Sequence, residues 1–405
     1  MGEYTRKAKV YSMAERNLNF DQVVNRKGTD CIKYDFAKER GREEDILPLW
    51  VADMDFQTTS YVEDALVELA HHNIYGYTGT KEDFFEAVAG WMKRHHNWEV
   101  KPEWLFKTPG VCVAIANAVR AYTEPGDAVI VQKPVYYPFS SIIVQNQREL
   151  VSSDLVYDGQ GHYTIDFEDF EKKIADHRVK MFILCNPHNP VGRVWTKEEL
   201  LKIGQICKKY GVIVFSDEIH FDFIWKGEHH VFQEVDPAFR EFTITATAPS
   251  KTFNLAGLQQ SNIFIPNPSL FKAFEKAYTI SGLNELNVAG VVASRAAYTY
   301  GDEWYNAMKK YVRANIDFAI QFVNTRLPGV KIVEPEGTYL IWLDFNDLNL
   351  SESELEYLIE KKAKIWLDAG SMFGKSGRGF QRINTACPRR ILEEALERIE
   401  RALLS

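Results

Sequence analysis

Two continuous apolar runs with a helical pattern between them constrain the fold of this chain more than any other feature. Met181–Cys185 and residues 212–215 have the composition of strands that are buried on both faces. Between them, Thr196 and Glu199 form a capping box that starts a helix, and Gly211 is typical of a helix end. Strand–helix–strand alternation with buried strands predicts an α/β fold with a parallel sheet.

The chain has 405 residues, which is more than one hydrophobic core usually serves, so we expect two domains. We predict a large domain over residues 51–295. A smaller C-terminal α/β domain over residues 296–405 would contain an amphipathic helix (303–327), short strands (339–343 and 380–384) and a last helix (388–404). Residues 1–50 are expected to pack near the small domain.

Charge and composition argue against several classes of partner. The formal net charge of −8 argues against nucleic acid, which needs a basic face. We find no secretory signal in residues 1–20 and no run of eighteen apolar residues, so no membrane is expected. The five cysteines are an odd count without a C-x-x-C pair. Three pairs of adjacent histidines, at 71–72, 95–96 and 229–230, suit a surface better than a metal site. These features together predict a soluble cytoplasmic protein without a metal.

Three polar side chains follow three of the expected strands. Asn186 follows the first apolar run, Asp217 follows the second, and Lys251 follows the alternating run Thr243–Thr247. Parallel sheets bind ligands at the carboxyl ends of their strands. An amine that bonds to an aldehyde, a carboxylate facing a ring nitrogen and an amide facing a ring hydroxyl are what pyridoxal 5'-phosphate requires. We therefore predict that Lys251 binds this cofactor covalently and later moves protons at Cα of the substrate.

Other residues would complete the cofactor site. Gly110, Val111 and Cys112 lie between an expected strand and a helix, where backbone N–H groups and the helix dipole favour a phosphate. Ser250 would add a hydroxyl, and Tyr136 would stack on the cofactor ring.

Arg382 is the expected ligand of the substrate carboxylate, because a guanidinium binds a carboxylate through two hydrogen bonds. A structural salt bridge is the alternative for Arg382. Taken singly, the other candidates also have plainer explanations: Lys251 a surface lysine, Asp217 a strand-end acid, Asn186 a turn residue and Tyr136 a core aromatic.

Several longer motifs resemble one enzyme family. Residues 248–254 (APSKTFN), 186–192 (NPHNPVG) and 216–220 (SDEIH) resemble fold-type I pyridoxal-phosphate enzymes of the aminotransferase class I/II group. Residues 50–56, 75–78, 134–139 and 382–388 look like the cystathionine β-lyase branch of MalY/PatB type, which includes cystalysin. The resemblance extends from about residue 25 to the C-terminal helix.

The resemblance implies a mostly parallel seven-stranded sheet in the large domain and a homodimer with shared active sites. It implies that Tyr77 reaches the cofactor phosphate of the partner subunit, although Tyr75 is an alternative. Ala52 and Asp53 would line the substrate entrance, and Tyr137 would contact the substrate or donate a proton.

Two positions depart from the wider aminotransferase pattern. Most aminotransferases have an arginine for the phosphate where this chain has Gln259, and commonly a tyrosine where it has His220. Both changes agree with the lyase branch, and His220 remains a predicted cofactor contact.

The resemblance implies a carbon–sulfur β-lyase that converts a sulfur amino acid into pyruvate, ammonia and a thiol. Two alternatives stay open: an aminotransferase that uses the same site, and a regulatory protein that binds a partner and retains residual lyase activity. The sequence does not identify the physiological thioether.

Overall fold

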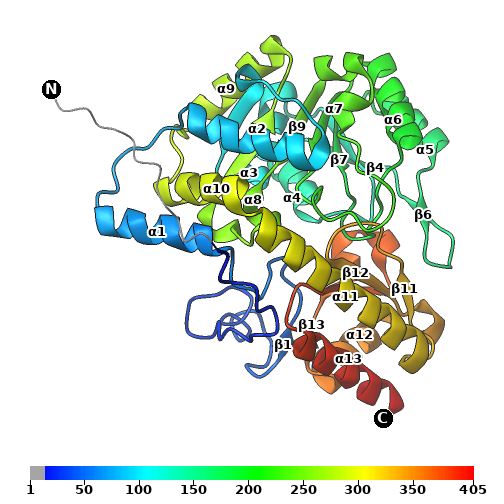
Figure 1. Ribbon diagram of the computed structural model, residues 1–405. Coiled ribbons are helices and arrows are strands. Elements are labelled where there is room, and N and C mark those ends of the chain that lie inside the picture. The colour runs from blue at the N-terminus through cyan, green and yellow to red at the C-terminus, as the bar shows by residue number, and fades with distance from the viewer. Residues whose placement is uncertain (1–13) are drawn as a thin grey trace.

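The computed structural model describes residues 14–405, and its two largest sheets lie at different ends of the molecule (Figure 1). Residues 1–13 lie outside the described residues, as does most of the segment in which no secretory signal was predicted. Within residues 14–405, no helix is long and apolar enough to cross a membrane.

The large sheet has seven strands in the order β2-β10-β9-β8-β7-β3-β4. Their bounds are β2 Leu105–Thr108, β3 Ala128–Val131, β4 Glu149–Ser152, β7 Met181–Cys185, β8 Ile213–Asp217, β9 Thr243–Thr247 and β10 Ser261–Phe264. Only β10 runs antiparallel to its neighbours, and the other pairs are parallel. The predicted mostly parallel sheet of seven strands is confirmed. Because β8 ends at Asp217, this carboxylate is the last strand residue rather than the first loop residue.

Helices cover both faces of this sheet. One face packs against α3 (Val111–Tyr122), α4 (Pro138–Gln145) and α9 (Pro268–Ile280). The other packs against α5 (Phe167–Asp176), α6 (Lys197–Tyr210) and the short α7 (Phe232–Val235). The predicted capping box starts α6, and Gly211 ends it with a left-handed φ of 68°. These three-layer contacts bury the apolar strands completely, as their composition predicted.

A further group of helices lies beside this sheet: α1 (Ser60–His72), α2 (Glu82–His96), α8 (Pro249–Thr252) and α10 (Val288–Tyr300). The long helix α11 (Asp302–Arg326) follows α10 and runs on to the small sheet (Figure 1). One continuous apolar core includes side chains of α2, α11 and the C-terminal helix α13 (Arg389–Leu404). The predicted domain division at residues 295 and 296 stays a prediction, and it falls inside α10.

The small sheet is antiparallel, with the order β11-β12-β15-β14. Its strands are β11 Lys331–Val333, β12 Leu340–Asp344, β14 Asp368–Ala369 and β15 Phe380–Asn384, and helix α12 (Glu352–Glu356) lies between β12 and β14 in the chain. A separate hairpin, β5 (Val156–Tyr157) with β6 (Tyr163–Thr164), projects at the side of the molecule (Figure 1).

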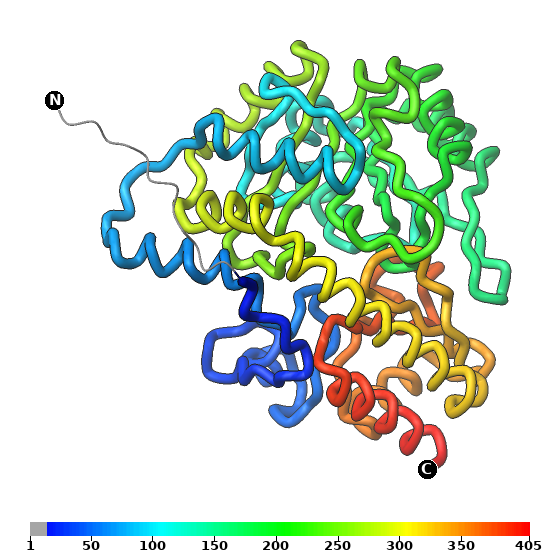
Figure 2. Tube along the Cα trace, in the orientation of Figure 1, coloured from blue at the N-terminus to red at the C-terminus, as the bar shows by residue number. Residues whose placement is uncertain are grey.

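The N-terminal segment lies beside the small sheet, as the blue and red parts of the tube show (Figure 2). Strand β1 (Leu47–Pro48) pairs in parallel with β13 (Ile365–Trp366). The ring of Trp50 stacks on the ring of Trp366 at 4.4 Å between centroids. This contact brings the residues that follow β1 to the gap between the two sheets.

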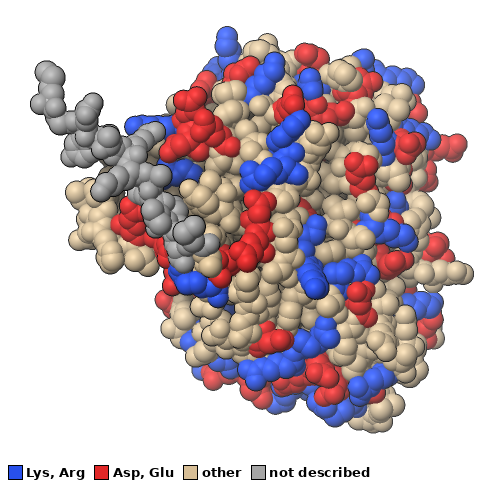
Figure 3. Space-filling model, in the orientation of Figure 1, with Lys and Arg blue, Asp and Glu red and all other residues tan. Residues whose placement is uncertain are grey.

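Acidic and basic side chains are interspersed over the face of the molecule drawn in Figure 3. Neither sign dominates that face.

Candidate active site

A cavity of about 190 Å³ lies at the carboxyl ends of β7 and β8. Its lining comes from sequence-distant loops and includes most of the predicted site residues: Ala52, Gly110, Val111, Cys112, Tyr136, Asp217, His220, Ser250 and Lys251. The lining contains both an amine and a carboxylate in a largely apolar surrounding, which is typical of a cofactor site.

Lys251 lies in α8, four residues after β9 ends, and its amine points at the N-terminal segment. Its Nζ donates a hydrogen bond of 2.6 Å to the carbonyl oxygen of Ala52. Removal of this amine from water lowers the pKa of Lys251; Asp53 opposes this effect, and Arg382 adds to it. A lowered pKa favours the neutral amine, which is the form that attacks an aldehyde and accepts a proton.

Asp217 is buried at the end of β8, and its Oδ1 accepts a 3.2 Å hydrogen bond from the backbone N–H of Ile219. Burial raises the pKa of Asp217 to about 7, against the opposing effects of that hydrogen bond and of Lys251. The charge of Lys251 acts on Asp217, but no residue of 14–405 forms an ion pair with it, so a protonated ring nitrogen in the cavity would be a favourable partner.

The N-terminus of α3 forms one end of the cavity. Gly110 is the N-cap residue, with a φ of 123° that favours glycine, and it provides no side-chain cap. The first N–H groups of a helix have no partner within the helix. Together with Ser250, which also lines the cavity, they form a site suited to a phosphate. Gln259, the position without the usual arginine, lines this cavity too.

The structure places Asn189, not Asn186, in the cavity lining. The side chain of Asn186 is buried, and its amide donates a 3.1 Å hydrogen bond to the carbonyl of His230. Asn189 accepts a 3.0 Å hydrogen bond from Nη1 of Arg382. The loop after β7 thus brings an amide to the cavity lining, three residues beyond the asparagine that the sequence predicted. The contact of either amide with a ring hydroxyl stays a prediction.

Two rings complete the lining. Tyr136 is half-buried, and its backbone N–H donates to the carbonyl of Asn189 at 3.0 Å. His220 is buried, its Nδ1 has no hydrogen-bond partner, and burial holds its pKa well below the usual value. A neutral imidazole with a free ring nitrogen beside Asp217 is available to contact a ligand.

Arg382 in β15 is almost fully buried, and its charge is already paired. Its Nη2 donates to the carboxylate of Asp368, the residue directly opposite on β14, and to the carbonyl of Trp50 at 2.9 Å. Nη1 bonds Asn189, and Nε has no partner. Arg382 therefore makes the structural ion pair that was the alternative expectation, and it contacts the cavity lining through Asn189. Its binding of a substrate carboxylate stays a prediction.

Besides Asn186 and Arg382, three predicted site residues are absent from the cavity lining. The carboxylate of Asp53 is held by Arg26 through bonds of 3.1 and 2.6 Å, so only its charge acts on Lys251. Tyr137 packs its ring against Phe373 at 5.7 Å, near Arg382. Tyr77 is 98% exposed, in a surface loop between α1 and α2.

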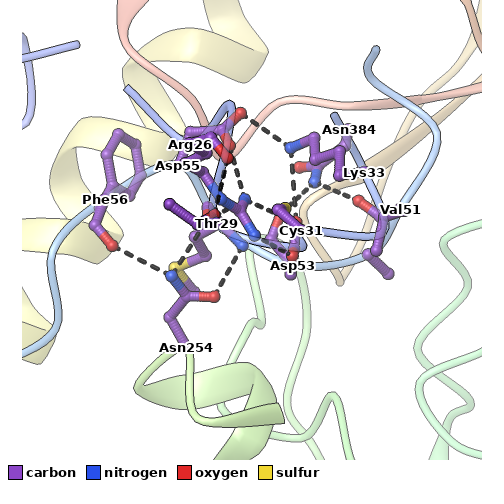
Figure 4. A network of polar contacts seen from close by, with 12 residues as sticks. Arg26, Thr29, Cys31, Lys33, Val51, Asp53, Asp55, Phe56, Asn254 and Asn384 are labelled. Atoms are coloured by element: carbon purple, nitrogen blue, oxygen red, sulfur yellow. Dashed lines mark hydrogen bonds and ion pairs between the residues drawn. The ribbon is translucent and has the colours of Figure 1, made fainter. Parts of the chain in front are cut away.

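A polar network holds residues 51–56 in place (Figure 4). Ala52 of this segment lines the cavity and accepts the hydrogen bond of Lys251. Lys33 is fully buried and binds Asp55 at 2.7 Å. Asn254 accepts a hydrogen bond from the backbone N–H of Met54 and donates to two carbonyls of the segment. Asn384 donates to two further carbonyls, at 2.7 and 2.5 Å. The sequence motif at residues 50–56 was noticed, but its partners at residues 26 and 33 were missed because only the folded chain brings them together.

Among described residues, no group of three or more histidine, cysteine, aspartate or glutamate side chains could hold a metal ion.

Comparison with known proteins identifies the family. The family described as Aminotransferase class I and II matches residues 44–399. The chain belongs to this family. Cystathionine beta-lyase PatB of Bacillus subtilis is 44% identical over 387 residues, which cover 95% of this chain and 100% of that protein.

Two solved structures agree with this assignment. Cystalysin of Treponema denticola, which contains a pyridoxal 5'-phosphate cofactor, has a TM-score of 0.91 and 39% identity, with 95% of this chain and 98% of that chain covered. The pyridoxal-phosphate-bound C–S lyase of Staphylococcus hominis has a TM-score of 0.89 and 33% identity, with 96% and 99% covered. The resemblance to the MalY/PatB-type branch and the fold-type I architecture are therefore confirmed.

Proposed function

We propose that this protein is a pyridoxal-phosphate-dependent carbon–sulfur β-lyase that acts on cysteine thioethers such as cystathionine. The observation that carries the proposal is the meeting of Lys251, Asp217 and the N-terminus of α3 around one cavity. The names of the relatives support the same chemistry. When bound, pyridoxal phosphate supplies an aldehyde that bonds to amines and a ring that accepts the electron pair released at Cα.

The donor set of the cavity fits this cofactor. Asp217 would hold the proton on the ring nitrogen, and the backbone of Gly110–Cys112 with Ser250 would hold the phosphate. Tyr136 would lie against the ring. Asn189 and His220 would face the polar edge of the ring. Asn186 would stabilise the loop through its hydrogen bond to the carbonyl of His230.

Lys251 would bond to the cofactor and, when released, remove the proton from Cα of the substrate. Its lowered pKa favours the unprotonated amine, which is the form that this step requires. The C–S bond then breaks, the thiol takes a proton, and the remaining three-carbon unit reacts with water to give pyruvate and ammonia.

Arg382 would bind the substrate carboxylate and thereby orient the Cα–H bond, a positioning effect that aids the reaction. The Ala52–Asp53 turn would border the substrate. Tyr137 is our candidate for the proton donor to the leaving thiol, because its hydroxyl lies close enough to Arg382 and Asp368 for both charges to influence its pKa.

We further propose a homodimer in which Tyr77 reaches the cofactor phosphate of the partner subunit. The extreme exposure of Tyr77 and of Tyr75 supports this role, since large aromatic side chains are seldom left uncovered. All five cysteines are free, which supports a reducing compartment such as the cytoplasm.

The decisive experiment mixes the purified holoenzyme with L-cystathionine in the absence of any keto acid. We expect pyruvate and a free thiol in equal amounts. Lys251→Ala should abolish both products, whereas the exposed Lys197→Ala should leave them unchanged. Turnover that starts only after a keto acid is added would instead establish an aminotransferase, and a holoenzyme inert under both conditions would favour the regulatory alternative.

A further inference from the structure

The positive charge of Arg382 is balanced inside the protein. Arg382 and Asp368 have side chains that are only 3% and 2% exposed, and they form a direct ion pair. A substrate carboxylate that binds Arg382 therefore meets a cation that already has an anionic partner. Additional attraction for an anionic substrate has to come from another group near the entrance.

A second arginine, Arg40, lies on the Trp50 face of the Trp50–Trp366 stack, on the side of the site where Arg382 lies. The guanidinium of Arg40 lies over the ring of Trp50, 5.0 Å from its centroid. Arg42 takes the equivalent place over Trp366, at 4.5 Å. The two arginines thus cap the two outer faces of one aromatic pair.

These two arginines differ in their partners. Arg42 donates two hydrogen bonds, of 3.0 and 2.6 Å, to the carboxylate of Glu360. Within residues 14–405, the guanidinium of Arg40 makes no ion pair and no hydrogen bond, and the residue is exposed. A guanidinium held over an aromatic ring without a hydrogen-bond partner has N–H groups available for an anion.

Two contacts locate Arg40 relative to the site. Trp50, whose ring carries Arg40, accepts a 2.9 Å hydrogen bond from Arg382 through its carbonyl. Burial raises the pKa of Tyr137 and Asp368 adds to this rise, whereas the charges of Arg382 and Arg40 both oppose it. Arg40 therefore lies close enough to act on the same phenol as Arg382.

We propose that Arg40 determines specificity by binding a second carboxylate, at the far end of the sulfur-linked arm of the substrate. This inference rests on the proposed lyase function and deepens it: the preferred substrates are thioether amino acids whose leaving thiol carries an acid group. Arg382 holds the carboxylate next to Cα, and Arg40 holds the distant one.

The test compares two cysteine thioethers that differ only in charge at the far end, S-(2-carboxyethyl)-L-cysteine and its amide S-(2-carbamoylethyl)-L-cysteine. The wild-type holoenzyme should favour the acid in kcat/KM by on the order of tenfold, the factor typical of one charge-assisted contact. In Arg40→Gln this preference should fall to about one, with kcat/KM for the amide unchanged.

Two further variants make the result specific. Arg42→Gln, which removes the paired neighbour, should keep the preference for the acid. Arg40→Lys should keep part of it, because the charge remains and the planar fork is lost. Added salt should reduce the preference in the wild type and in Arg42→Gln but not in Arg40→Gln, since screening acts only on the charged contact.

An unchanged preference in Arg40→Gln would overturn the inference. Equal losses on the acid and the amide would also overturn it, because Arg40 would then only support the fold of the N-terminal segment. If the wild type cleaves neither thioether, nor cystathionine, the proposed lyase function itself is wrong and the inference is lost with it.

Discussion

At the residue scale, the two asparagines of the loop after β7 have separate tasks. Asn186 is turned away from the cavity, toward the carbonyl of His230, while Asn189 lines the cavity and bonds Arg382. An amide that positions both the cofactor and the substrate arginine should matter for catalysis. An amide that bonds a half-buried carbonyl of a neighbouring loop should matter for stability.

We therefore expect Asn189→Ala to lower kcat/KM by on the order of a hundredfold, with a smaller effect on unfolding. Asn186→Ala should do the reverse and lower the free energy of unfolding by about 1 kcal/mol, because the half-buried carbonyl of His230 loses its donor. Steady-state kinetics and urea denaturation of both variants check this. A larger catalytic loss in Asn186→Ala would restore the assignment made from the sequence.

The sequence contained the right loop but could not choose between these residues. An asparagine that directly follows a strand is the simpler expectation for a side chain at the strand end. The choice depends on how the loop folds back, with the N–H of His188 bonded to the carbonyl of Arg193 and that of Gly192 bonded to His188. Such reversals depend on long-range packing, which local propensity does not encode.

At the element scale, regular strands and helices were predictable and the segment at residues 51–56 was not. Continuous apolar runs identified β7 and β8, and capping signals identified α6, with boundary shifts of a residue or two. Residues 51–56 have no regular structure, and their shape is imposed by side chains from residues 26, 33, 254 and 384. Because those partners are far apart in the sequence, the periodicity of the segment could not reveal them.

A substitution of Lys33 tests how much this network contributes to the free energy of unfolding. Replacement by methionine leaves the buried Asp55 with Arg26 as its one ion-pair partner among the described residues, and breaking a buried ion pair typically costs about 3 to 5 kcal/mol. The matched control is Lys38→Met, because Lys38 and Glu44 form a surface pair with side chains 78% and 79% exposed. Lys38→Met should lower the free energy of unfolding by at most about 1 kcal/mol.

Guanidinium denaturation of both holoenzyme variants gives the two free energies of unfolding. We expect Lys33→Met also to lower kcat, because Ala52, which contacts Lys251, belongs to the same segment. Equal destabilisation by the two changes would contradict the role given to the network.

At the scale of the whole molecule, the α/β class and the seven-stranded sheet followed from the sequence and from the family motifs. The continuity of the core did not follow from the sequence: α11 and the N-terminal segment join the two sheets. Residue 295, the expected domain boundary, lies inside α10 and not in a linker. Contacts such as β1 with β13 join residues more than 300 positions apart in the sequence, and no local pattern announces them.

Asp217 links the active site to the stability of the whole chain. Its pKa rises from 3.8 in the unfolded chain to about 7 in the fold, because of burial. The folded state therefore holds the proton more tightly, and its contribution to stability is complete below about pH 4 and lost as the pH rises to about 7.

In protein stripped of cofactor, the wild type should lose roughly 2 to 3 kcal/mol between about pH 5 and about pH 7.5, relative to Asp217→Asn, which cannot ionise. Urea denaturation across this range measures the difference. Adding pyridoxal phosphate should shrink it, because a ring N–H stabilises the ionised carboxylate. A difference that does not vary with pH would show that Asp217 is ionised normally in the fold.

The carbonyl groups of residues 50 to 52 fix the positions of three side chains of the site relative to one another. The first accepts a hydrogen bond from Arg382, the next from Asn384 and the third from Lys251. Three consecutive peptide units thus set the distance between the guanidinium that would bind the substrate carboxylate and the amine that would remove the Cα proton. Insertion or deletion of a single residue here would change the distance between the Arg382 guanidinium and the Lys251 amine, although neither residue had been altered.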